Sequence, residues 1–388
     1  MPLLLAMSAS ITMPRFSWVA NGTIAAMENH RAFGHAFGTQ FGDMITKRFA
    51  AKQSLTNILK AAHTPAGAAL YQEFLTMHRA TFPHAIAELE GLAEGSGIDF
   101  ETVFLQNINE EFSLCSADLP GVQPANVTTD ACSDVMACDP DRASAYCAVA
   151  HNEDNAAEDR GTLVLVNASF GDQGPQWLAA TYAGGLPSGA FGYSKTGGFG
   201  FTLNYVGPKQ PACPGVGRGF ISRQLLSAGS YHDALALITT ARMGSGHNYQ
   251  LFSFGVSSPK RYTPPRVTNV EVAPGGLFSV RPIGATPFFH ANQYQTLRVA
   301  DWEGNSTLHR LKRYAELTPP KSTAEMLHIL GDQQDRSWPI FHDNASHARG
   351  DQSDWTMCTA LFDLTSKRLT VYLGNPRAGH VDYSASLV

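Results

Sequence analysis

The sequence has few charged residues and lacks any long hydrophobic run. Only 16% of its 388 residues are charged and 44% are hydrophobic, which is typical of a compact globular chain and excludes a disordered one. No apolar run approaches the roughly 20 residues that span a bilayer, so we expect no membrane association. The net charge of −5 gives no electrostatic reason to expect nucleic acid as a partner.

Motifs for metals and nucleotides are missing as well. No CxxC pair and no HExxH sequence occurs, so we predict no metal site. No GxGxxG or GxxxxGK[ST] sequence opens a helix after a strand, which argues against nucleotide-binding folds, and we predict no cofactor.

Cysteines are too sparse for a disulfide scaffold. Six occur, and the ordinary role of any one of them in a chain of this length is that of a small buried hydrophobic residue. They are Cys115, Cys132, Cys138, Cys147, Cys213 and Cys358.

The signals for cellular location conflict. The stretch from Met1 to Met7 is apolar but lacks the basic region of a signal peptide, so we predict a cytoplasmic protein. Five N-x-S/T sequons point toward secretion and raise a rival hypothesis, a non-catalytic secreted glycoprotein with an uncleaved chain. The sequons begin at Asn21, Asn126, Asn167, Asn305 and Asn344.

The predicted secondary structure changes from helices to strands after about the first third of the chain. Apolar residues recur at helical spacing over 67–94, and a further helix is predicted to begin at Asp99. A polar connector that contains proline and glycine spans 116–131, and strands dominate after it. Strands are predicted at 145–150, 162–168, 177–182, 198–205, 249–255, 266–272 and 277–281.

The second part of the chain also contains helices. They are predicted at 219–242, 306–317 and 323–334, and a hairpin of 357–364 and 368–372 closes the chain. Helices, strands, helices and strands in this order favour an α+β fold with mainly antiparallel sheets over repeated βαβ units.

Cys132 stands where the connector ends and the strands begin. A flexible connector is a place where a chain can be cut without losing its core. If the bond between Ala131 and Cys132 is broken, the cysteine gains an α-amino group with an ordinary pKa of roughly 7.7–8.0. An amine in that range can act as the general base for its own thiol near neutral pH. Cleavage itself would be an N→S acyl shift, in which the thiol attacks the carbonyl of Ala131 and water resolves the thioester.

The residues around Cys132 resemble a known family. The segment 130–134, Asp-Ala-Cys-Ser-Asp, and the segment 151–154, His-Asn-Glu-Asp, are similar to the self-processing site of the acyl-coenzyme A:6-aminopenicillanate acyltransferase-like family. Within it, this combination looks most like the β-alanyl-dopamine/carcinine hydrolase branch. Further segments follow the family's order, namely 34–45, 182–204, 217–223, 247–249, 269–271, 290–292 and 374–376.

The resemblance implies a fold and a processed form. The fold is the four-layer αββα sandwich of N-terminal nucleophile hydrolases. A single domain, 1–388, would be cut into chains of about 1–131 and 132–388 that stay together as an alpha/beta heterodimer. The family usually has glycine before the nucleophile, whereas Ala131 stands here and lacks the conformational freedom of glycine, so we expect slower or incomplete processing.

The resemblance also implies site residues. Cys132 would be the nucleophile, Asp154 would hold the α-amino group or orient the cysteine, and Asn292 would form part of the oxyanion hole. A basic residue late in the family's chain assists the thiolate and substrate. Here His342 stands where arginine is expected, so the assignment stays open between it and the flanking Arg336 and Arg349.

Two further residues are candidates for substrate binding. Glu111 is a candidate for the ammonium group of a β-alanyl substrate, with an ordinary surface carboxylate as the alternative. His290 is the other candidate, although a core histidine is its more common role.

The function implied is hydrolysis of a small N-acyl amine through an acyl thioester on Cys132. The first candidates are β-alanyl amides such as β-alanyl-dopamine or carcinine. The alternative is acyl transfer of the penicillin acyltransferase type, in which an amine displaces water and a coenzyme A thioester donates the acyl group.

Overall fold

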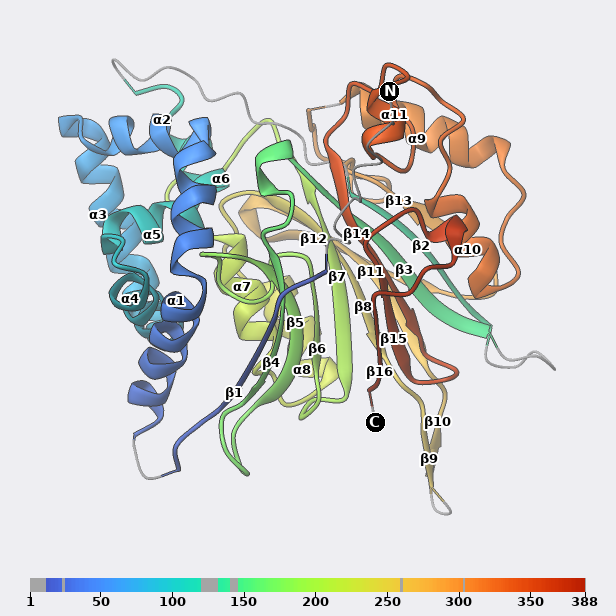
Figure 1. Cartoon of the computed structure of the whole chain (residues 1–388), viewed down its shortest axis with the longest axis horizontal. Coiled ribbons are helices and arrows are strands. Elements are labelled where there is room, and N and C mark those ends of the chain that lie inside the picture. The colour runs from blue at the N-terminus through green and yellow to red at the C-terminus, as the bar shows by residue number, and fades with distance from the viewer. Residues whose placement is uncertain are drawn as a thin grey trace, which may run out of the picture.

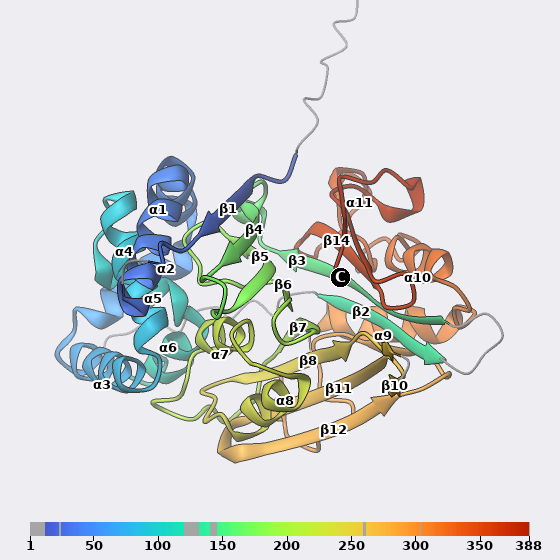
Figure 2. The same ribbon diagram turned by 90° about the horizontal axis from the view of Figure 1, so that it is seen from below.

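The layers of the molecule are visible in the computed structural model, which describes residues 12–22, 25–119, 132–139, 146–258, 261–302 and 304–387. Two large β-sheets lie face to face, and helices cover the outer side of each (Figure 1). Figure 2 shows the same order of layers from below. The expected four-layer αββα arrangement is confirmed.

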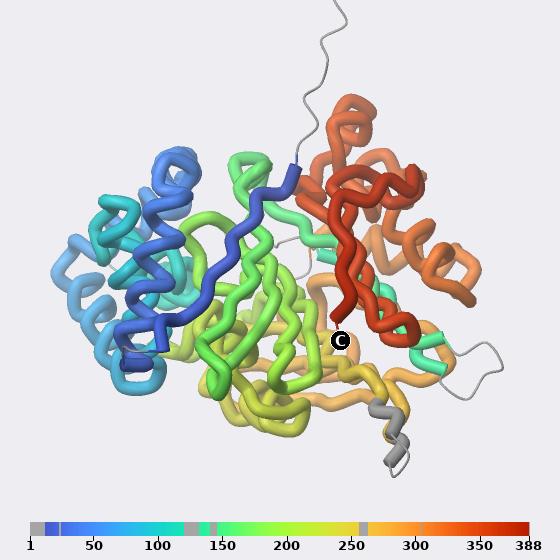
Figure 3. The backbone as a smooth tube through the Cα atoms, turned by 60° about the horizontal axis from the view of Figure 1, so that its bottom comes forward, coloured from blue at the N-terminus to red at the C-terminus, as the bar shows by residue number. Residues whose placement is uncertain are grey.

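The first sheet has eight strands and is almost entirely antiparallel. Its order is β1 (Arg15–Val19), β4 (Leu163–Ser169), β5 (Gln176–Tyr182), β6 (Phe191–Ser194), β7 (Phe199–Val206), β8 (Gly246–Ser253), β11 (Arg266–Ala273) and β12 (Leu277–Ile283). Only the pair β1–β4 is parallel. Figure 3 shows β1, in blue, crossing from the helical layer to lie beside the green strands.

The second sheet has six antiparallel strands. Its order is β13 (Phe288–His290), β2 (Ser133–Asp139), β3 (Tyr146–Asn155), β14 (Trp355–Asp363), β15 (Arg368–Tyr372) and β16 (Tyr383–Ser386). β14 and β15 confirm the predicted closing hairpin. A separate hairpin joins β9 (Val256–Ser258) to β10 (Arg261–Thr263). Six strands of three to five residues were not predicted, because so few residues carry too little alternation to distinguish a strand from a loop. The seven-residue strand β2 was not predicted either.

The helices form two outer layers. The first consists of α1 (Ala26–Ala51), α2 (Gln53–Ala62), α3 (Pro65–Thr81), α4 (Pro83–Ser96), α5 (Phe100–Asn107), α6 (Asn109–Ser116), α7 (Arg218–Leu225) and α8 (Tyr231–Thr240). The second consists of α9 (Asn305–Glu316), α10 (Thr323–Leu330) and α11 (Asn344–His347). Within the described residues, no helix is both long enough and apolar enough to cross a bilayer.

Two predicted helices are each divided in the structure. The helix predicted at 67–94 breaks at Phe82, whose φ of −130° and ψ of 55° lie outside the helical region, because Pro83 follows it. The helix predicted at 219–242 breaks before Ser230, whose side chain accepts a hydrogen bond from the Asp233 amide and caps α8.

Three apolar layers hold the sandwich together. One lies between the first helical layer and the eight-stranded sheet, one lies between the sheets, and one lies between the six-stranded sheet and α10. Phe104, Phe252 and Val135 are fully buried representatives of these layers. Because α1–α6 bury their apolar face against the sheet, the helical part has no separate core.

Four cysteines form two disulfides, which were not predicted because six cysteines were considered too few for a disulfide scaffold. Cys115 at the end of α6 is bonded to Cys213 in the loop before α7, and Cys138 is bonded to Cys147 across the pair β2–β3. The first pair is 98 residues apart in the sequence, so only the tertiary structure could reveal it. Cys132 and Cys358 are buried thiols, as expected for small buried cysteines.

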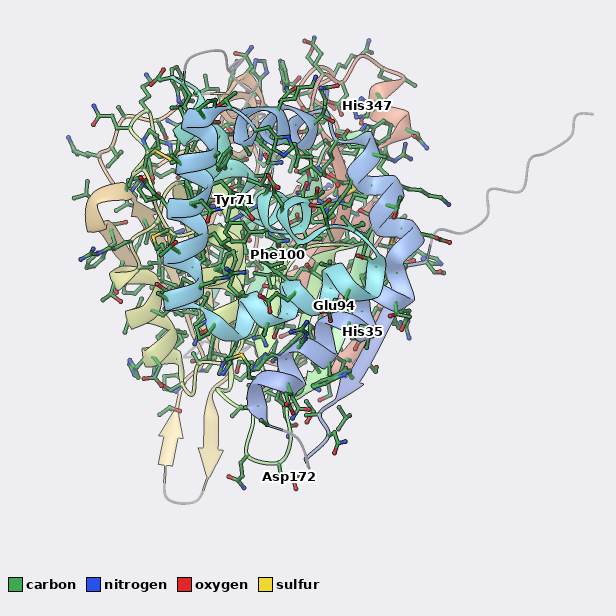
Figure 4. All side chains as sticks on the ribbon, turned by 90° about the vertical axis from the view of Figure 1, so that its left-hand side faces the viewer. His35, Tyr71, Glu94, Phe100, Asp172 and His347 are labelled. Carbon is green, nitrogen blue, oxygen red and sulfur yellow. A yellow bond between two sulfur atoms is a disulfide. The ribbon has the colours of Figure 1, made fainter. Side chains whose placement is uncertain are left out.

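Helices α1 and α4 pack at glycine positions. A β-carbon on Gly34 would overlap the main-chain oxygen of Glu88, and one on Gly38 would lie 2.5 Å from the main-chain oxygen of Leu92. In Figure 4, His35 on α1 and Glu94 on α4 are labelled close together. The glycines therefore permit backbones to approach more closely than any side chain would allow.

This packing predicts opposite effects for two glycine substitutions on α1. Gly34→Ala should lower the free energy of unfolding by about 2 kcal/mol or more, because the added methyl group meets backbone. Gly42→Ala is the matched control. Its β-carbon would lie 3.5 Å from the Ser96 α-carbon, an ordinary contact, so helix propensity should leave stability unchanged or raise it by about 1 kcal/mol. Equal midpoints of urea unfolding for the two variants would contradict this account.

Candidate active site

Cys132 lies immediately before β2 and on the wall of a large cavity. Its side chain is buried, and it is among the residues that line a cavity of about 700 Å³. The Sγ atom is 3.8 Å from Oε2 of Glu153 and 3.7 Å from the main-chain oxygen of Asp154. The antiparallel register pairs Ser133 with Asn152, so the end of β3 faces the nucleophile position.

A buried arginine contacts Cys132. Arg310 on α9 is completely buried, and its Nη1 donates to the main-chain oxygen of Cys132 over 2.6 Å and to Oγ of Ser133 over 2.9 Å. Its Nε donates to Oγ of Ser306 one turn earlier. Such charge-assisted hydrogen bonds are stronger than neutral ones, so Arg310 holds the start of β2 in place.

The basic residue beside Cys132 comes from a segment other than the one expected from the sequence. The expected candidates were His342, Arg336 and Arg349, whereas the structure brings Arg310 to Cys132. A usable signal was present in the predicted helix 306–317. Ser306 and Thr307 stand four and three residues before Arg310, at the spacing where side chains on a helix meet.

Asn292 reaches the site through Arg310. Its Oδ1 accepts a hydrogen bond from Nη2 of Arg310 over 2.8 Å, and its Nδ2 donates to the main-chain oxygen of Tyr205 over 3.1 Å. A second amide lies nearer to the nucleophile. Nδ2 of Asn204 on β7 donates to the main-chain oxygen of Cys132 over 3.3 Å. The oxyanion role of Asn292 stays a prediction, and Asn204 is an additional donor that the sequence did not indicate.

The segment His-Asn-Glu-Asp at 151–154 divides between two faces of β3. Successive strand residues point to opposite faces, so His151 and Glu153 face the eight-stranded sheet, whereas Asn152 and Asp154 face the outer helices. Consistent with this, Asn152 donates from Nδ2 to the main-chain oxygens of Leu330 and Ile340. Asn152 therefore has a structural role, and Glu153 is the member of the segment that lines the cavity.

Asp154 faces away from the cavity. Its Oδ2 lies 3.8 Å from Nε2 of His342, whose Nδ1 is 3.0 Å from Oδ2 of Asp351. Burial raises the pKa of Asp154 to about 6, against the opposing effect of His342 and Arg310. The main-chain oxygen of Asp154 is the atom recorded beside the thiol, at 3.7 Å, and the predicted contact of its carboxylate with the α-amino group stays a prediction.

His151 lies between two carboxylates. Its Nδ1 is 3.1 Å from Oδ1 of Asp134, and its Nε2 is 3.1 Å from Oε2 of Glu153. Burial acts to lower the pKa of His151, but the carboxylates outweigh it and raise the pKa to about 10. His151 is therefore an imidazolium at neutral pH. Thr202 donates to Asp134 and Tyr182 donates to Glu153, which completes a chain of polar side chains behind the thiol.

The predicted substrate-binding residues are not all at the cavity. Glu111 lines it, and burial together with the neighbouring Glu110 raises the pKa of Glu111 to about 8. His290 is buried against Glu271, and His342 is buried behind Asp154; neither lines the cavity. Arg349 is exposed and donates to Gln333. Their positions leave Glu111 as the one member of this set in a position to meet a ligand.

Among the residues that the structure describes, two groups of side chains have ligand atoms close enough to share a metal ion. In one, the ligand atoms of Cys132, His151 and Glu153 lie within 4.8 Å of one another. A ligand must lose its proton to bind a metal, and the raised pKa of His151 opposes that loss. The other group consists of Glu110, Glu111 and His247, and there the Arg218 guanidinium already pairs with Glu110.

Ala131, the other side of the predicted cleavage bond, lies outside the described residues. The described chain begins again at Cys132, so the geometry above concerns the nucleophile and its surroundings alone.

Comparison with known proteins identifies the class of enzyme. Residues 141–378 match the family described as acyl-coenzyme A:6-aminopenicillanic acid acyl-transferase. The match covers more than half of the chain, so the chain belongs to this family, and it is an enzyme that acts on amide bonds or transfers acyl groups.

A relative extends the similarity over most of the chain. The beta-alanyl-dopamine/carcinine hydrolase of Drosophila melanogaster is 24% identical over 368 residues, which cover 89% of this chain and 91% of that protein. The family match starts after Cys132 and includes Glu153, Asn292 and Arg310. The assignment of the nucleophile therefore depends on geometry around Cys132.

The site predicts that the two buried thiols differ in reactivity. Cys132 lines the cavity, whereas Cys358 is completely buried and its pKa is raised well above the ordinary value by burial. Iodoacetamide on the native protein should therefore alkylate Cys132 at least about tenfold faster than Cys358, because access and thiolate character control the rate. Peptide mass spectrometry measures both sites in one sample. Equal alkylation rates at Cys132 and Cys358 would contradict the placement of Cys132 on the cavity wall.

The charge of His151 predicts a pH-dependent contribution to stability. Its pKa is about 10 in the folded protein and roughly 6.5 in the unfolded chain. The stabilisation is therefore fully present below about pH 6.5 and is lost as the pH rises toward 10. The Tm difference between Cys132→Ala and the double variant Cys132→Ala/His151→Gln should shrink between pH 7 and 10. The shared Cys132→Ala background keeps both proteins uncut, and a constant difference would refute the charged histidine.

Proposed function

We propose that this enzyme is a self-processing cysteine amidohydrolase, which hydrolyses a small N-acyl amine through an acyl thioester on Cys132. The observation that carries the proposal is the position of Cys132, at the start of a strand and on the cavity wall, with Arg310 and Asn204 on its carbonyl oxygen. Membership of the acyltransferase family supports the same chemistry. It also argues against the non-catalytic glycoprotein.

Processing would begin in the uncut chain. Sγ of Cys132 attacks the carbonyl carbon of Ala131, the nitrogen of Cys132 leaves and takes up a proton, and a thioester forms. Water then hydrolyses this ester and regenerates the thiol. The products are the chains 1–131 and 132–388. They remain associated as an alpha/beta heterodimer because α1–α6 bury their apolar face against the eight-stranded sheet.

Turnover would use the amine that processing creates. With an ordinary pKa near 8, the α-amino group accepts the proton of its own thiol. The thiolate attacks the substrate carbonyl, the amine departs with a proton, and water hydrolyses the acyl thioester. An amide donor aimed at the developing oxyanion typically contributes a few kcal/mol to such a step, and Asn204 and Asn292 are the candidates.

The substrates that we propose are β-alanyl amides such as β-alanyl-dopamine or carcinine. They follow from the similarity to the Drosophila hydrolase. Acyl transfer from a coenzyme A thioester is the second candidate, since it shares the covalent intermediate. One observation favours it. Arg48 and Lys52 line the cavity and share the single carboxylate of Asp159, which leaves a net positive charge suited to phosphate groups.

The cytoplasmic location remains a prediction. The two disulfides bear on it, because disulfides are rare in reducing compartments and common in secreted proteins.

The disulfide Cys115–Cys213 predicts a distinctive gel pattern. Cys115 belongs to the chain before the proposed cut and Cys213 to the chain after it, so the bond links the two products. A processed protein should therefore run as one full-length band without reductant and as two bands with it. N-terminal sequencing of the larger product should read Cys-Ser-Asp-Val.

Cys132→Ala is the control for this experiment. It should give one band under both conditions and no amidase activity, because the nucleophile for both reactions is gone. A wild-type chain that stays full-length with reductant would refute self-processing. Amidase activity in Cys132→Ala would refute the nucleophile.

A further inference from the structure

The carboxylate of Glu153 has no role in the mechanism above, although it lies beside the nucleophile. Its Oε2 is 3.8 Å from Sγ of Cys132, and its side chain lines the same cavity. A group attached to Sγ as a thioester must therefore extend past this carboxylate.

The surroundings of Glu153 hold it in one place. Oε1 accepts a hydrogen bond from the Tyr182 hydroxyl over 2.7 Å, and Oε2 is 3.1 Å from Nε2 of His151. The Cys132 thiol is a third donor, 3.8 Å from Oε2, and its hydrogen is lost when an acyl thioester forms. A carboxylate has about four lone-pair sites, so Tyr182 and His151 then leave capacity for a further donor from the cavity.

The cations near Glu153 are paired with other groups. Arg310 donates to the main-chain oxygen of Cys132, and Arg48 and Lys52 share the carboxylate of Asp159. The carboxylate of Glu153 lines the cavity beside the imidazole of His151, which also contacts Asp134. A cationic substrate group could therefore meet Glu153 without displacing a cation of the protein.

The other carboxylates of the cavity are less suitable for an ammonium group. Glu110 already pairs with the Arg218 guanidinium. The raised pKa of Glu111, about 8, keeps that carboxyl protonated near neutral pH. The ammonium acceptor expected at Glu111 from the sequence is therefore better placed at Glu153.

We propose that Glu153 binds the ammonium group of the acyl part of the substrate and favours acyl chains that carry an amine a few bonds from the carbonyl carbon, as a β-alanyl group does. The inference rests on the proposed function, since it places that carbonyl on Sγ of Cys132. Three single bonds of roughly 1.5 Å separate the carbonyl carbon from the nitrogen in a β-alanyl group. With the carbonyl carbon bonded to Sγ, this chain is long enough to bring its nitrogen within hydrogen-bonding distance of Oε2, which lies 3.8 Å from Sγ, whereas a neutral acyl chain of the same length leaves the carboxylate without its partner.

The test compares four amides of one amine, with glycyl, β-alanyl, γ-aminobutyryl and propionyl as the acyl groups. The wild-type protein should show a kcat/KM for the β-alanyl amide that is roughly ten to a hundred times that for the propionyl amide, as a charge-assisted hydrogen bond predicts. Glu153→Gln should remove most of this preference and change propionyl turnover far less. Glu158→Gln, which removes another carboxylate of the cavity wall, should retain the preference.

A second variant separates recognition from structure. Glu153→Asp keeps the charge but withdraws it by about one bond length, so the preference should move toward the longer γ-aminobutyryl amide. A purely structural role would instead lower turnover of all four amides by the same factor.

The outcomes distinguish this inference from the proposed function. Equal wild-type turnover of the propionyl and β-alanyl amides would overturn the role of Glu153 and leave the amidohydrolase intact. Retained β-alanyl preference in Glu153→Gln would also overturn it. Absence of turnover for all four amides by processed wild-type protein would refute hydrolysis of these substrates, and the inference with it. If Glu153→Gln fails to process, the wild-type series and Glu153→Asp still decide.

Discussion

The buried guanidinium of Arg310 is the interaction on which the site depends. It joins α9 to the carbonyl oxygen of Cys132, to Ser133 and to Asn292, which stands just after β13. Removing a buried partner from such a network leaves charges and donors without water or protein to satisfy them, which is costly. The same network therefore holds Cys132 in place and attaches the outer helical layer to the six-stranded sheet.

Alternation along β3 explains how one short segment serves both sides of its sheet. Val149, His151 and Glu153 face the eight-stranded sheet, so the layer between the sheets is apolar at one end and polar where it meets the cavity. Asp154 faces the opposite side, toward His342. A shift of one residue in the register would exchange these roles, which makes the pairing of β2 with β3 a requirement of the chemistry.

The helices and strands that could be predicted are those with a strong hydrophobic periodicity within one element. Long amphipathic segments and the closing hairpin were correctly placed, because their periodicity is visible within one element. Divided helices were not, because the break depends on Pro83 and on the Ser230 cap within otherwise continuous apolar patterns. Among the candidate site residues, Cys132 was predicted from its place after the connector and from the family resemblance, and the structure puts it on the cavity wall. Arg310, Glu153 and Asn204 were not predicted, because each acts through a partner that is distant in sequence.

By itself, the sequence determined that the chain is globular, that helices give way to strands near Cys132, and that the chain resembles one family. Composition, periodicity and motif order are local properties that can be read without the fold. The tertiary structure decided which residues distant in the sequence come into contact. It paired Cys115 with Cys213, selected Arg310 as the basic residue at Cys132 and turned Glu153, rather than Asp154, toward the cavity. The physical reason is that hydrogen bonds and ion pairs act over a few ångströms, and only folding brings distant residues within that range.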